Sequence, residues 1–302
     1  MSAVVEKQES RWSVHYPKIS VVTPSYNQGI FLEKTICSVL GQSYPSLEYI
    51  IVDGGSTDQS LAIIKKYQHH LAYWVSEQDG GQSAALNKGF RRCTGEIVGW
   101  LNSDDLYVGE ALSFAADYFC QHRETAMVYG DAELIDGRGN FIRHVRSLPF
   151  DRTLGLMGFG SILQPTAFWR RTIFDAVGYL DEELEYAMDG EFWARIAAKH
   201  LVISQVPMLL ARLRLHASSK MARVLSGQCP RAQQEREILL SRYYRNLDVS
   251  RLVPLHYAPL LRKIFRLKQI FQRAIYGYYF AGYRSRRYVK RRCLDTRPLM
   301  VR

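Results

Sequence analysis

The first half of the chain alternates short, β-branched apolar runs with longer segments whose apolar residues recur every three or four positions. Short apolar runs predict buried strands of a parallel sheet, and the longer spacing predicts amphipathic helices that cover it. The predicted strands are 19–23, 49–52, 73–75, 97–101 and 126–129. The predicted helices between them include 58–67, 82–91 and 109–119. This alternation indicates an α/β protein with a mostly parallel, Rossmann-like central sheet.

The pattern changes after about residue 130. Further along, the residues predict a hairpin tip at 136–140, strands at 165–169 and 209–215, and helices at 170–177 and 186–199. Beyond Pro230 the chain is basic, rich in tyrosine and of helical pattern. The predicted organisation is therefore an N-terminal extension (1–17), an α/β domain (18–228) and a basic helical C-terminal region (229–302).

Charge is distributed unevenly between these parts. The whole chain carries a net charge of +11, but residues 231–302 hold 18 Lys+Arg and 4 Asp+Glu, which leaves −3 for the rest. An attraction to acidic partners is therefore a property of the C-terminal region alone.

Composition also limits the location and the redox state. No uninterrupted apolar run approaches the ~18 residues that indicate a membrane span, and residues 1–15 lack the apolar core of a signal peptide. We therefore expect a cytoplasmic protein. The five cysteines are scattered, without a CxxC pair, which predicts reduced, mostly buried thiols.

Polar segments follow three of the predicted strands, at residues 23–26, 53–56 and 102–105. Ligands of open parallel sheets bind beyond the carboxyl ends of the strands, so these segments are predicted to line one crevice. Asp104 and Asp105 repel each other unless a cation lies near, and Mg²⁺ or Mn²⁺ prefers such oxygen ligands. The alternative is a solvated acidic helix start. Asp53 offers an acceptor for the N–H of a nucleobase, or simply begins a turn.

Four further side chains are candidates on weaker grounds. Gln82 and Asn87, on the helix after Gly80-Gly81, could reach a nucleotide or a sugar, or lie in solvent at an ordinary helix entry. Asp189 begins a helix and could act as a general base, or merely interact with the helix dipole. His216 ends a strand and could bind a metal or a diphosphate, or be a packing residue.

Taken together, the motifs resemble glycosyltransferase family 2, the inverting group with the GT-A fold. The carrying segments are ISVVTPSYN (19–27), EYIIVDGGSTD (48–58), DGGQSAALNKG (79–89), WLNSDD (100–105) and MDGEFWARIA (188–197). The resemblance covers about residues 18–216, and the order and spacing of the motifs make it specific.

On the donor side, the resemblance implies a binding site for a nucleotide-diphosphate sugar. Thr23, Pro24 and Tyr26 would border the nucleobase. Asp53 would accept the ring N–H of the base, which favours a UDP- or dTDP-sugar.

On the catalytic side, the resemblance implies that Asp105 is the principal ligand of Mn²⁺ or Mg²⁺ and that Asp104 lies near the ribose or the metal. Asp189 matches the position of the catalytic base. Two departures weaken the match, since Asn102 and Gly54 stand where many members have an acid.

The basic tail bears on the acceptor. Basic residues interleaved with aromatics between 262 and 292 suit the interface of an anionic membrane. A saccharide or lipid-linked acceptor in cell-surface polysaccharide synthesis, and peripheral binding to the inner face of the membrane, would fit. A solvated helical pair explains the same pattern.

Two rival functions remain open at this level. A sugar nucleotidyltransferase would carry a Gly- and Lys-rich phosphate loop after the first strand, where this chain has residues 24–27, PSYN. A nucleic-acid-binding protein is disfavoured because the positive charge is confined to the tail while the predicted crevice is acidic.

Overall fold

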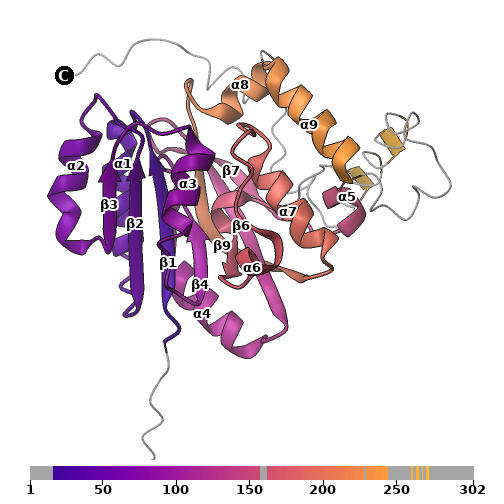
Figure 1. The fold of residues 1–302 in the computed structure, drawn as a ribbon, viewed down its shortest axis with the longest axis horizontal. Coiled ribbons are helices and arrows are strands. Elements are labelled where there is room, and N and C mark those ends of the chain that lie inside the picture. Colours follow the sequence, from indigo (N-terminus) through magenta and orange to yellow (C-terminus); the bar gives the residue numbers. More distant parts are fainter. Residues whose placement is uncertain are drawn as a thin grey trace, which may run out of the picture.

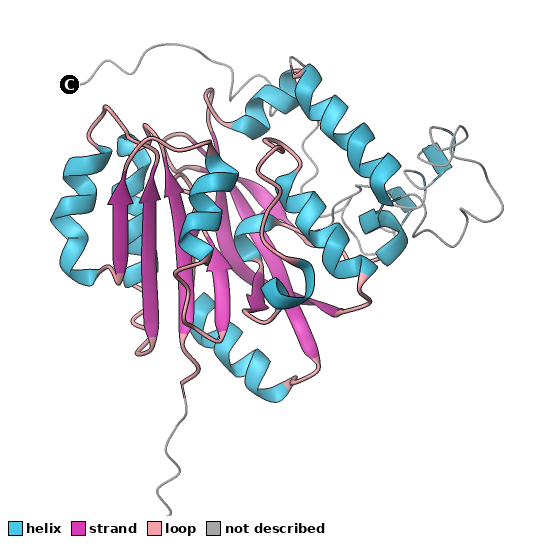
Figure 2. Cartoon of the chain, in the orientation of Figure 1, coloured by secondary structure: helices cyan, strands magenta, loops and turns pink. Residues whose placement is uncertain are grey.

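The computed structural model describes residues 16–156, 162–227 and 229–243, and six residues further on (260, 263, 264, 267, 270 and 271). Within these residues the strands form one nine-stranded sheet in the order β3-β2-β1-β4-β8-β6-β9-β5, with β7 paired to β6. Helices cover both faces of the sheet (Figure 1; Figure 2). The predicted α/β class with a mostly parallel sheet is confirmed.

The N-terminal half forms the regular parallel part of the sheet. Its elements are β1 (Ile19–Ser25), α1 (Gly29–Leu40), β2 (Leu47–Asp53), α2 (Ser60–Tyr67), a 3-10 turn (Gln68–His70), β3 (Tyr73–Ser76), α3 (Gln82–Phe90) and β4 (Ile97–Trp100). β1 lies between β2 and β4, and β2 between β1 and β3, all in parallel register. Every residue of β1 is buried, which explains its continuous apolar pattern.

The second half adds strands of both directions. Its elements are β5 (Leu106–Tyr107), α4 (Ala111–Gln121), β6 (Thr125–Asp136), β7 (Phe141–Val145), α5 (Arg152–Leu156), a 3-10 turn (Gln164–Thr166), β8 (Phe168–Arg170), α6 (Ile173–Val177), α7 (Met188–Ala198), β9 (Val202–Leu215), α8 (Lys220–Ser226) and α9 (Pro230–Tyr243). β8 is antiparallel to both β4 and β6, β9 is parallel to β6, and β5 is antiparallel to β9. The hairpin tip predicted at 136–140 joins β6 to β7, as expected.

Two hydrophobic layers enclose the sheet. On one face, residues such as Val22 and Val98 pack with α3, α7 and α9. On the other face, Val21 and Ile51 pack with α1 and α4. Alternate residues of each strand therefore enter opposite layers, as the two-residue period of a strand requires.

α9 belongs to this core, although the predicted domain boundary after residue 228 excluded it. Leu239, Leu240 and Tyr243 are buried in the same cluster as Trp193 of α7. The predicted N-terminal extension and the basic cluster at 284–292 lie outside the described residues, apart from positions 16 and 17.

Two sequence-based expectations about composition can be compared with the described residues. Their four cysteines are all free, but Cys37 and Cys120 are exposed, so the expectation of mostly buried thiols was wrong. In this part of the chain, no helix combines the length and the apolarity needed to cross a lipid bilayer.

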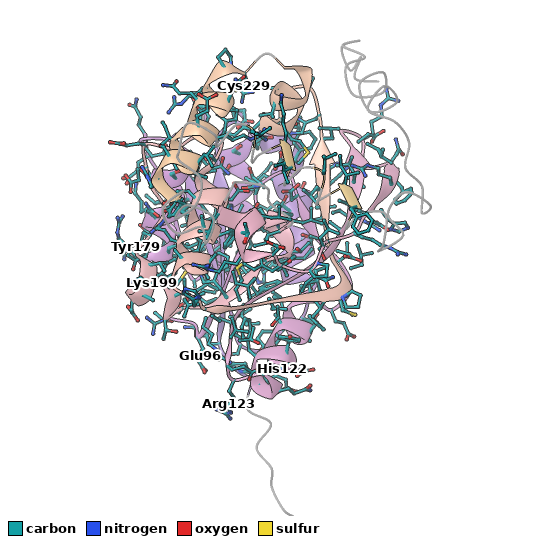
Figure 3. All side chains as sticks on the ribbon, turned by 90° about the vertical axis from the view of Figure 1, so that its right-hand side faces the viewer. Glu96, His122, Arg123, Tyr179, Lys199 and Cys229 are labelled. Carbon is teal, nitrogen blue, oxygen red and sulfur yellow. The ribbon has the colours of Figure 1, made fainter. Side chains whose placement is uncertain are left out.

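Parallel strands give the sheet two distinct ends. Figure 3 shows Glu96, which directly precedes β4, at one end with His122 and Arg123, and Cys229, which directly precedes α9, at the other. We call the end where β1, β2, β4 and β9 finish the carboxyl edge of the sheet. α8 and α9 follow β9 on this side (Figure 1).

Candidate functional site at the carboxyl edge

The carboxyl edge gathers predicted site residues that lie far apart in the sequence. Asp53 ends β2, Asp104 follows β4, and His216 follows β9. The parallel register of β1 with β2 and β4, and the pairing of β9 with β5, bring these three ends to one side of the sheet.

Asp104 and His216 form a close carboxylate–imidazole pair at this edge. Asp104 Oδ2 lies 2.9 Å from His216 Nε2, although the residues are 112 positions apart. His216 is 8% exposed, its Nδ1 lies 2.9 Å from Ser218 Oγ, and its ring packs on Phe31 of α1 with the centroids 4.6 Å apart. The histidine ring is thus held on three sides with Nε2 turned to the carboxylate.

Asp105 points into the protein instead. Its Oδ1 accepts the backbone N–H of Arg214 at 2.9 Å, and its side chain is buried. Burial, and next the negative charge of Asp104, raise the pKa of Asp105 well above its usual value. The expectation that Asp105 is the principal metal ligand does not fit this arrangement, because one oxygen is engaged by the backbone and the carboxylate faces β9. Asp104, which was expected near the ribose or the metal, is the acid of the pair that faces His216.

Arg214 binds the loop that follows β4 and carries Asp104 and Asp105, which we call the acidic loop, to β9. Besides its backbone bond to Asp105, its Nε donates to the carbonyl of Asp104 at 2.9 Å and its Nη1 to that of Asp136 at 3.3 Å. Arg214 is 4% exposed, its guanidinium stacks over Phe31, and burial lowers its pKa. Sequence reasoning missed Arg214, although its position two residues before His216 on an extended strand places both on one face.

An amide network replaces the missing acid at position 102. Asn102 Oδ1 accepts hydrogen bonds from Gln82 Nε2 at 2.7 Å and from Trp100 Nε1 at 2.8 Å. Its Nδ2 donates to Gln164 Oε1 at 2.9 Å and, more weakly, to Asp105 Oδ2 at 3.4 Å. Gln82 is therefore joined to the loop that carries Asp104 and Asp105, and its contact with a nucleotide or a sugar stays a prediction.

Asp53 is fully buried, with its carboxylate committed to neighbouring turns. Oδ1 accepts from Ser56 Oγ at 2.6 Å, and Oδ2 accepts from Ser56 N at 2.9 Å and Ser76 Oγ at 2.7 Å. This arrangement ties the end of β2 to the end of β3. These hydrogen bonds argue against the prediction that Asp53 accepts the N–H of a nucleobase, because a fully buried carboxylate cannot reach a ligand without rearrangement.

A second carboxylate lies beside the exit of β2. A Cβ placed on Gly54 would approach Asp79 Oδ2 to 2.9 Å, so the carboxylate of Asp79 occupies the space of a side chain at position 54. Asp79 Oδ1 accepts Gly81 N–H at 2.8 Å, which fixes the group, and Asp79 is only partly buried. The acid that the family pattern led us to expect at Gly54 is thus matched in space by one from the loop before α3.

The three predicted residues at the end of β1 differ in exposure. Thr23 is buried, with its Oγ1 3.2 Å from the hydroxyl of Tyr49, and Pro24 is buried as well. Tyr26 is 63% exposed, directly beyond the strand. The side chain of Thr23 therefore packs inside the protein instead of bordering the base, which corrects the prediction for this residue. The ring of Tyr26 is exposed and can contact a ligand.

Asn87 has a structural role, which corrects its assignment to the donor site. Its Nδ2 donates to the carbonyl of Leu180 at 2.9 Å and to Glu182 Oε1 at 2.8 Å, and its Oδ1 accepts Leu180 N–H at 2.9 Å. Asn87 is 1% exposed, and these bonds tie α3 to the segment before α7. Both hydrogens of the amide are used, so Asn87 offers no donor to a nucleotide.

Asp189 stands in the first turn of α7, partly exposed. Its Oδ1 accepts the N–H of Gly190 at 2.7 Å. Burial raises the pKa of Asp189, while the charges of Lys220 and Arg236 act in the opposite direction. Lys220, which sequence reasoning did not single out, lies at the start of α8, and burial lowers its pKa.

Glu191, two residues further along α7, is a structural acid by comparison. It is 1% exposed, and it accepts hydrogen bonds from Arg195 Nε at 2.9 Å and from the hydroxyl of Tyr243. Of the two acids in the first turn of α7, Asp189 is the one with free hydrogen-bonding capacity and a raised pKa.

Fold and site together define an α/β protein of GT-A type, with an acidic loop after a central strand facing a histidine from a later strand. The sequence model of glycosyl transferase family 2 matches residues 20–177, more than half of the chain, and the chain belongs to this family.

Relatives are numerous but distant. An uncharacterized glycosyltransferase of Rickettsia conorii is 25% identical over 84% of this chain and 42% of its own length. One of Rickettsia bellii is 27% identical over 74% of this chain and 34% of its own length. The chondroitin synthase of Escherichia coli is 32% identical over 48% of this chain and 21% of its own length. The chain thus spans less than half of these proteins.

Solved structures share the fold. Residues 1–349 of S. aureus TarS in complex with UDP-GlcNAc superpose with a TM-score of 0.57, at 20% identity, over 80% of this chain and 78% of that one. The mannosyltransferase PcManGT from Pyrobaculum calidifontis, in complex with GDP-Man and Mn²⁺, gives a TM-score of 0.54 at 18% identity, over 84% and 81%. These identities establish likeness of fold alone.

Proposed function

We propose that this chain transfers a sugar from a nucleotide-diphosphate donor to a hydroxyl of an acceptor. The observation that carries the proposal is the Asp104–His216 pair at the carboxyl edge, with Asp189 at the start of α7, in a chain of glycosyl transferase family 2. TarS and PcManGT, which share the fold, bind nucleotide sugars.

The residues at this edge suit a divalent cation. Asp104 Oδ2 and His216 Nε2 lie 2.9 Å apart as a hydrogen-bonded pair, so both atoms would be available to one cation bound at this place. A carboxylate with one imidazole is a donor set that Mn²⁺ accepts, and PcManGT binds Mn²⁺. The described residues contain no cluster of three or more such ligands, so the remaining positions would fall to water and to the diphosphate. Bound there, Mn²⁺ or Mg²⁺ would neutralise the charge on the leaving diphosphate.

The nucleobase side lies between Tyr26 and the exit of β2. The exposed ring of Tyr26 offers a stacking surface, and Asp79, held by Gly81 N–H, offers a carboxylate oxygen in the space beside Gly54. A carboxylate accepts the ring N–H of uracil or thymine. UDP- and dTDP-sugars are therefore the favoured donors, with Asp79 in the role first expected of Asp53.

Asp189 serves as the base in this proposal. Its raised pKa makes the carboxylate a stronger proton acceptor at neutral pH. The carboxylate removes the proton of an acceptor hydroxyl while that oxygen forms a bond to the anomeric carbon. The bond from the anomeric carbon to the diphosphate breaks, its electron pair leaves with the nucleoside diphosphate, and the anomeric configuration inverts.

The acceptor is proposed only as a saccharide or a lipid-linked saccharide. The relationship to a chondroitin synthase supports a saccharide. Beyond α9, the described apolar residues are helical and 44–65% exposed (Leu260, Ile264, Leu267, Ile270 and Phe271), and Lys263 is exposed as well. This exposure supports the proposed contact with an anionic membrane. The basic residues from 284 to 292 lie outside the described residues.

Product analysis tests the proposal. The purified chain is incubated with Mn²⁺ and a panel of UDP-, dTDP- and GDP-sugars, and both nucleoside diphosphate and pyrophosphate are measured. We expect free nucleoside diphosphate from a UDP- or dTDP-sugar, and much less from the Asp104→Asn and Asp189→Asn variants. Pyrophosphate release with a sugar phosphate and a nucleoside triphosphate would instead establish the nucleotidyltransferase.

A further inference from the structure

A single buried carboxylate of α9 holds the turn that leads into α7. Glu235 Oε1 accepts the backbone N–H of Glu185 at 2.9 Å, and its Oε2 accepts those of Tyr186 at 2.7 Å and Ala187 at 2.9 Å. Glu235 is 3% exposed. Three consecutive N–H groups are thus bound by one side chain that comes from 48 to 50 residues further along the chain.

The start of α7 needs such a partner. The three N–H groups that Glu235 binds belong to Glu185, Tyr186 and the N-cap residue Ala187, so they lie just before the first helical residue, Met188. N–H groups at the beginning of a helix have no acceptor within it, and Ala187 has no side chain that could accept one. Glu235 supplies an acceptor from another helix to the turn at this end, and its negative charge is favourable at the positive end of the helix dipole. Burial alone would raise the pKa of Glu235, but the three N–H bonds and Arg231 hold it below its usual value.

Neighbouring charges fix the same turn from both sides. Arg231 Nε lies 3.0 Å from Glu235 Oε1, and its Nη1 lies 3.0 Å from Glu185 Oε2. Lys220 Nζ donates to the carbonyl of Glu185 at 2.8 Å. Lys220 begins α8, four residues after the proposed metal ligand His216, so the turn is bonded to the segment that follows His216 as well as to α9.

We propose that Glu235 is a positioning residue for the proposed base Asp189, an inference that rests on the proposed function. Asp189 lies two residues beyond the bound turn, and the hydrogen bond described for its carboxylate comes from Gly190, within the same helix turn. The position of this carboxylate therefore depends on the backbone at 185–187. Because α9 supplies Glu235, α9 is part of the catalytic unit, which extends to at least Tyr243.

The test compares two substitutions on the same helix. Glu235→Gln keeps the size of the side chain but removes its charge and one of its two strong acceptors. Glu237→Gln makes the same chemical change two residues away, on an exposed side chain of α9. UDP release from UDP-GlcNAc with Mn²⁺, UDP binding, and amide hydrogen exchange at 185–187 are measured for both variants, the unchanged chain and Asp189→Asn.

We expect Glu235→Gln to lower kcat about 10- to 100-fold, because small misplacements of a catalytic group have effects of this size. KM for UDP-GlcNAc and the affinity for UDP should stay within about twofold, since the donor contacts are unchanged. Exchange at 185–187 should accelerate. The acid limb of the pH profile of kcat should move to lower pH, because a loosened Asp189 is better solvated. Glu237→Gln should behave like the unchanged chain.

A normal kcat and an unmoved acid limb in Glu235→Gln, beside an inactive Asp189→Asn, would overturn the positioning role while leaving the proposed base intact. A fully active Asp189→Asn would instead remove the base itself. If Glu235→Gln does not fold, Glu235→Asp carries the test, because it keeps the charge but withdraws the carboxylate by one methylene. It should then show the same fall in kcat with unchanged UDP affinity, and a normal kcat would refute the proposal.

Discussion

Removing each of the two acids in the first turn of α7 should affect a different property: stability for Glu191 and turnover for Asp189. Glu191 is 1% exposed and bonded to Arg195 and Tyr243. Removing one partner of a buried charge pair costs about 3–5 kcal/mol, a large share of the ~5–15 kcal/mol that stabilises a typical domain. Glu191→Ala should therefore lower the free energy of unfolding by about 3–5 kcal/mol, because it leaves Arg195 without its partner carboxylate.

Asp189→Asn should leave stability unharmed. Burial raises the pKa of Asp189 in the folded chain, so ionisation of this group favours the unfolded chain. The stability linked to Asp189 is complete below its unfolded pKa of about 4 and is lost as the pH rises through the higher folded value. At neutral pH the Asn variant escapes this loss, so it should be at least as stable as the unchanged chain, with the difference vanishing in acid. Its kcat should fall about 100-fold or more, as for other general bases.

Urea unfolding followed by tryptophan fluorescence measures the change in unfolding free energy, since Trp193 is buried on α7 and Trp169 is buried next to it, with their ring centroids 5.7 Å apart. Release of nucleoside diphosphate, measured where each variant is fully folded, gives the second. An unchanged unfolding midpoint for Glu191→Ala, or normal turnover for Asp189→Asn, would refute the division of roles between the two acids.

Three further predictions concern the rest of the site. Asp104→Asn and His216→Ala should each weaken Mn²⁺ binding in the presence of UDP by at least ~10-fold, the effect that even changes outside the direct ligands cause. Asp105→Asn should weaken it less, because asparagine keeps an acceptor for Arg214 N–H. Calorimetric titration with Mn²⁺ measures the three affinities. Asn87→Ala should lower the unfolding free energy by about 2–3 kcal/mol, because it leaves buried backbone groups unpaired, while UDP affinity stays constant. Gly89→Ala places a Cβ 2.4 Å from a methyl of Val22, and should cost about 1–3 kcal/mol in urea unfolding, as overpacking does.

β1, β2 and β4 could be predicted because they are buried on both faces of the sheet. β1 and β2 each contain a short apolar run, Val21–Val22 and Tyr49–Val52, followed by polar turn residues, a pattern typical of buried parallel strands. The first half of β9 is not evident from the sequence, which predicts a strand only from residue 209. Residues Ile203 to Gln205 are only half-buried, and Pro207 lies where three residues of β9 stand opposite Gly130 of β6. A proline ordinarily argues against a strand, and this bulge is the exception that admits it.

Within the site, the sequence predicted the acidic loop but not which acid faces outward. Asp104 and Asp105 are adjacent and chemically alike, and their directions depend on Arg214, which is more than a hundred residues away in sequence. The accessibility of Asp53 likewise depends on a distant residue, because its carboxylate accepts a hydrogen bond from Ser76 on the neighbouring strand. Local pattern gives the residue types at a strand end, whereas tertiary contacts decide which of them a ligand can reach.

The match to the family ends at residue 177, yet the proposed chemistry also depends on residues beyond that point. Asp104 lies within the matched segment, whereas His216 and Asp189 both lie outside it. His216 meets Asp104 because β9 joins the same sheet as β4, through β6 and β8. The turn before Asp189 is held by Glu235 and Lys220, which also lie beyond residue 177. A fragment that ended at residue 177 would keep the acidic loop and lose the proposed base, one proposed ligand and the Arg214 clamp. The proposed metal binding and turnover should therefore require the chain to at least Tyr243, since Arg214 and His216 contact the loop of Asp104 and Asp105 and α9 packs on α7.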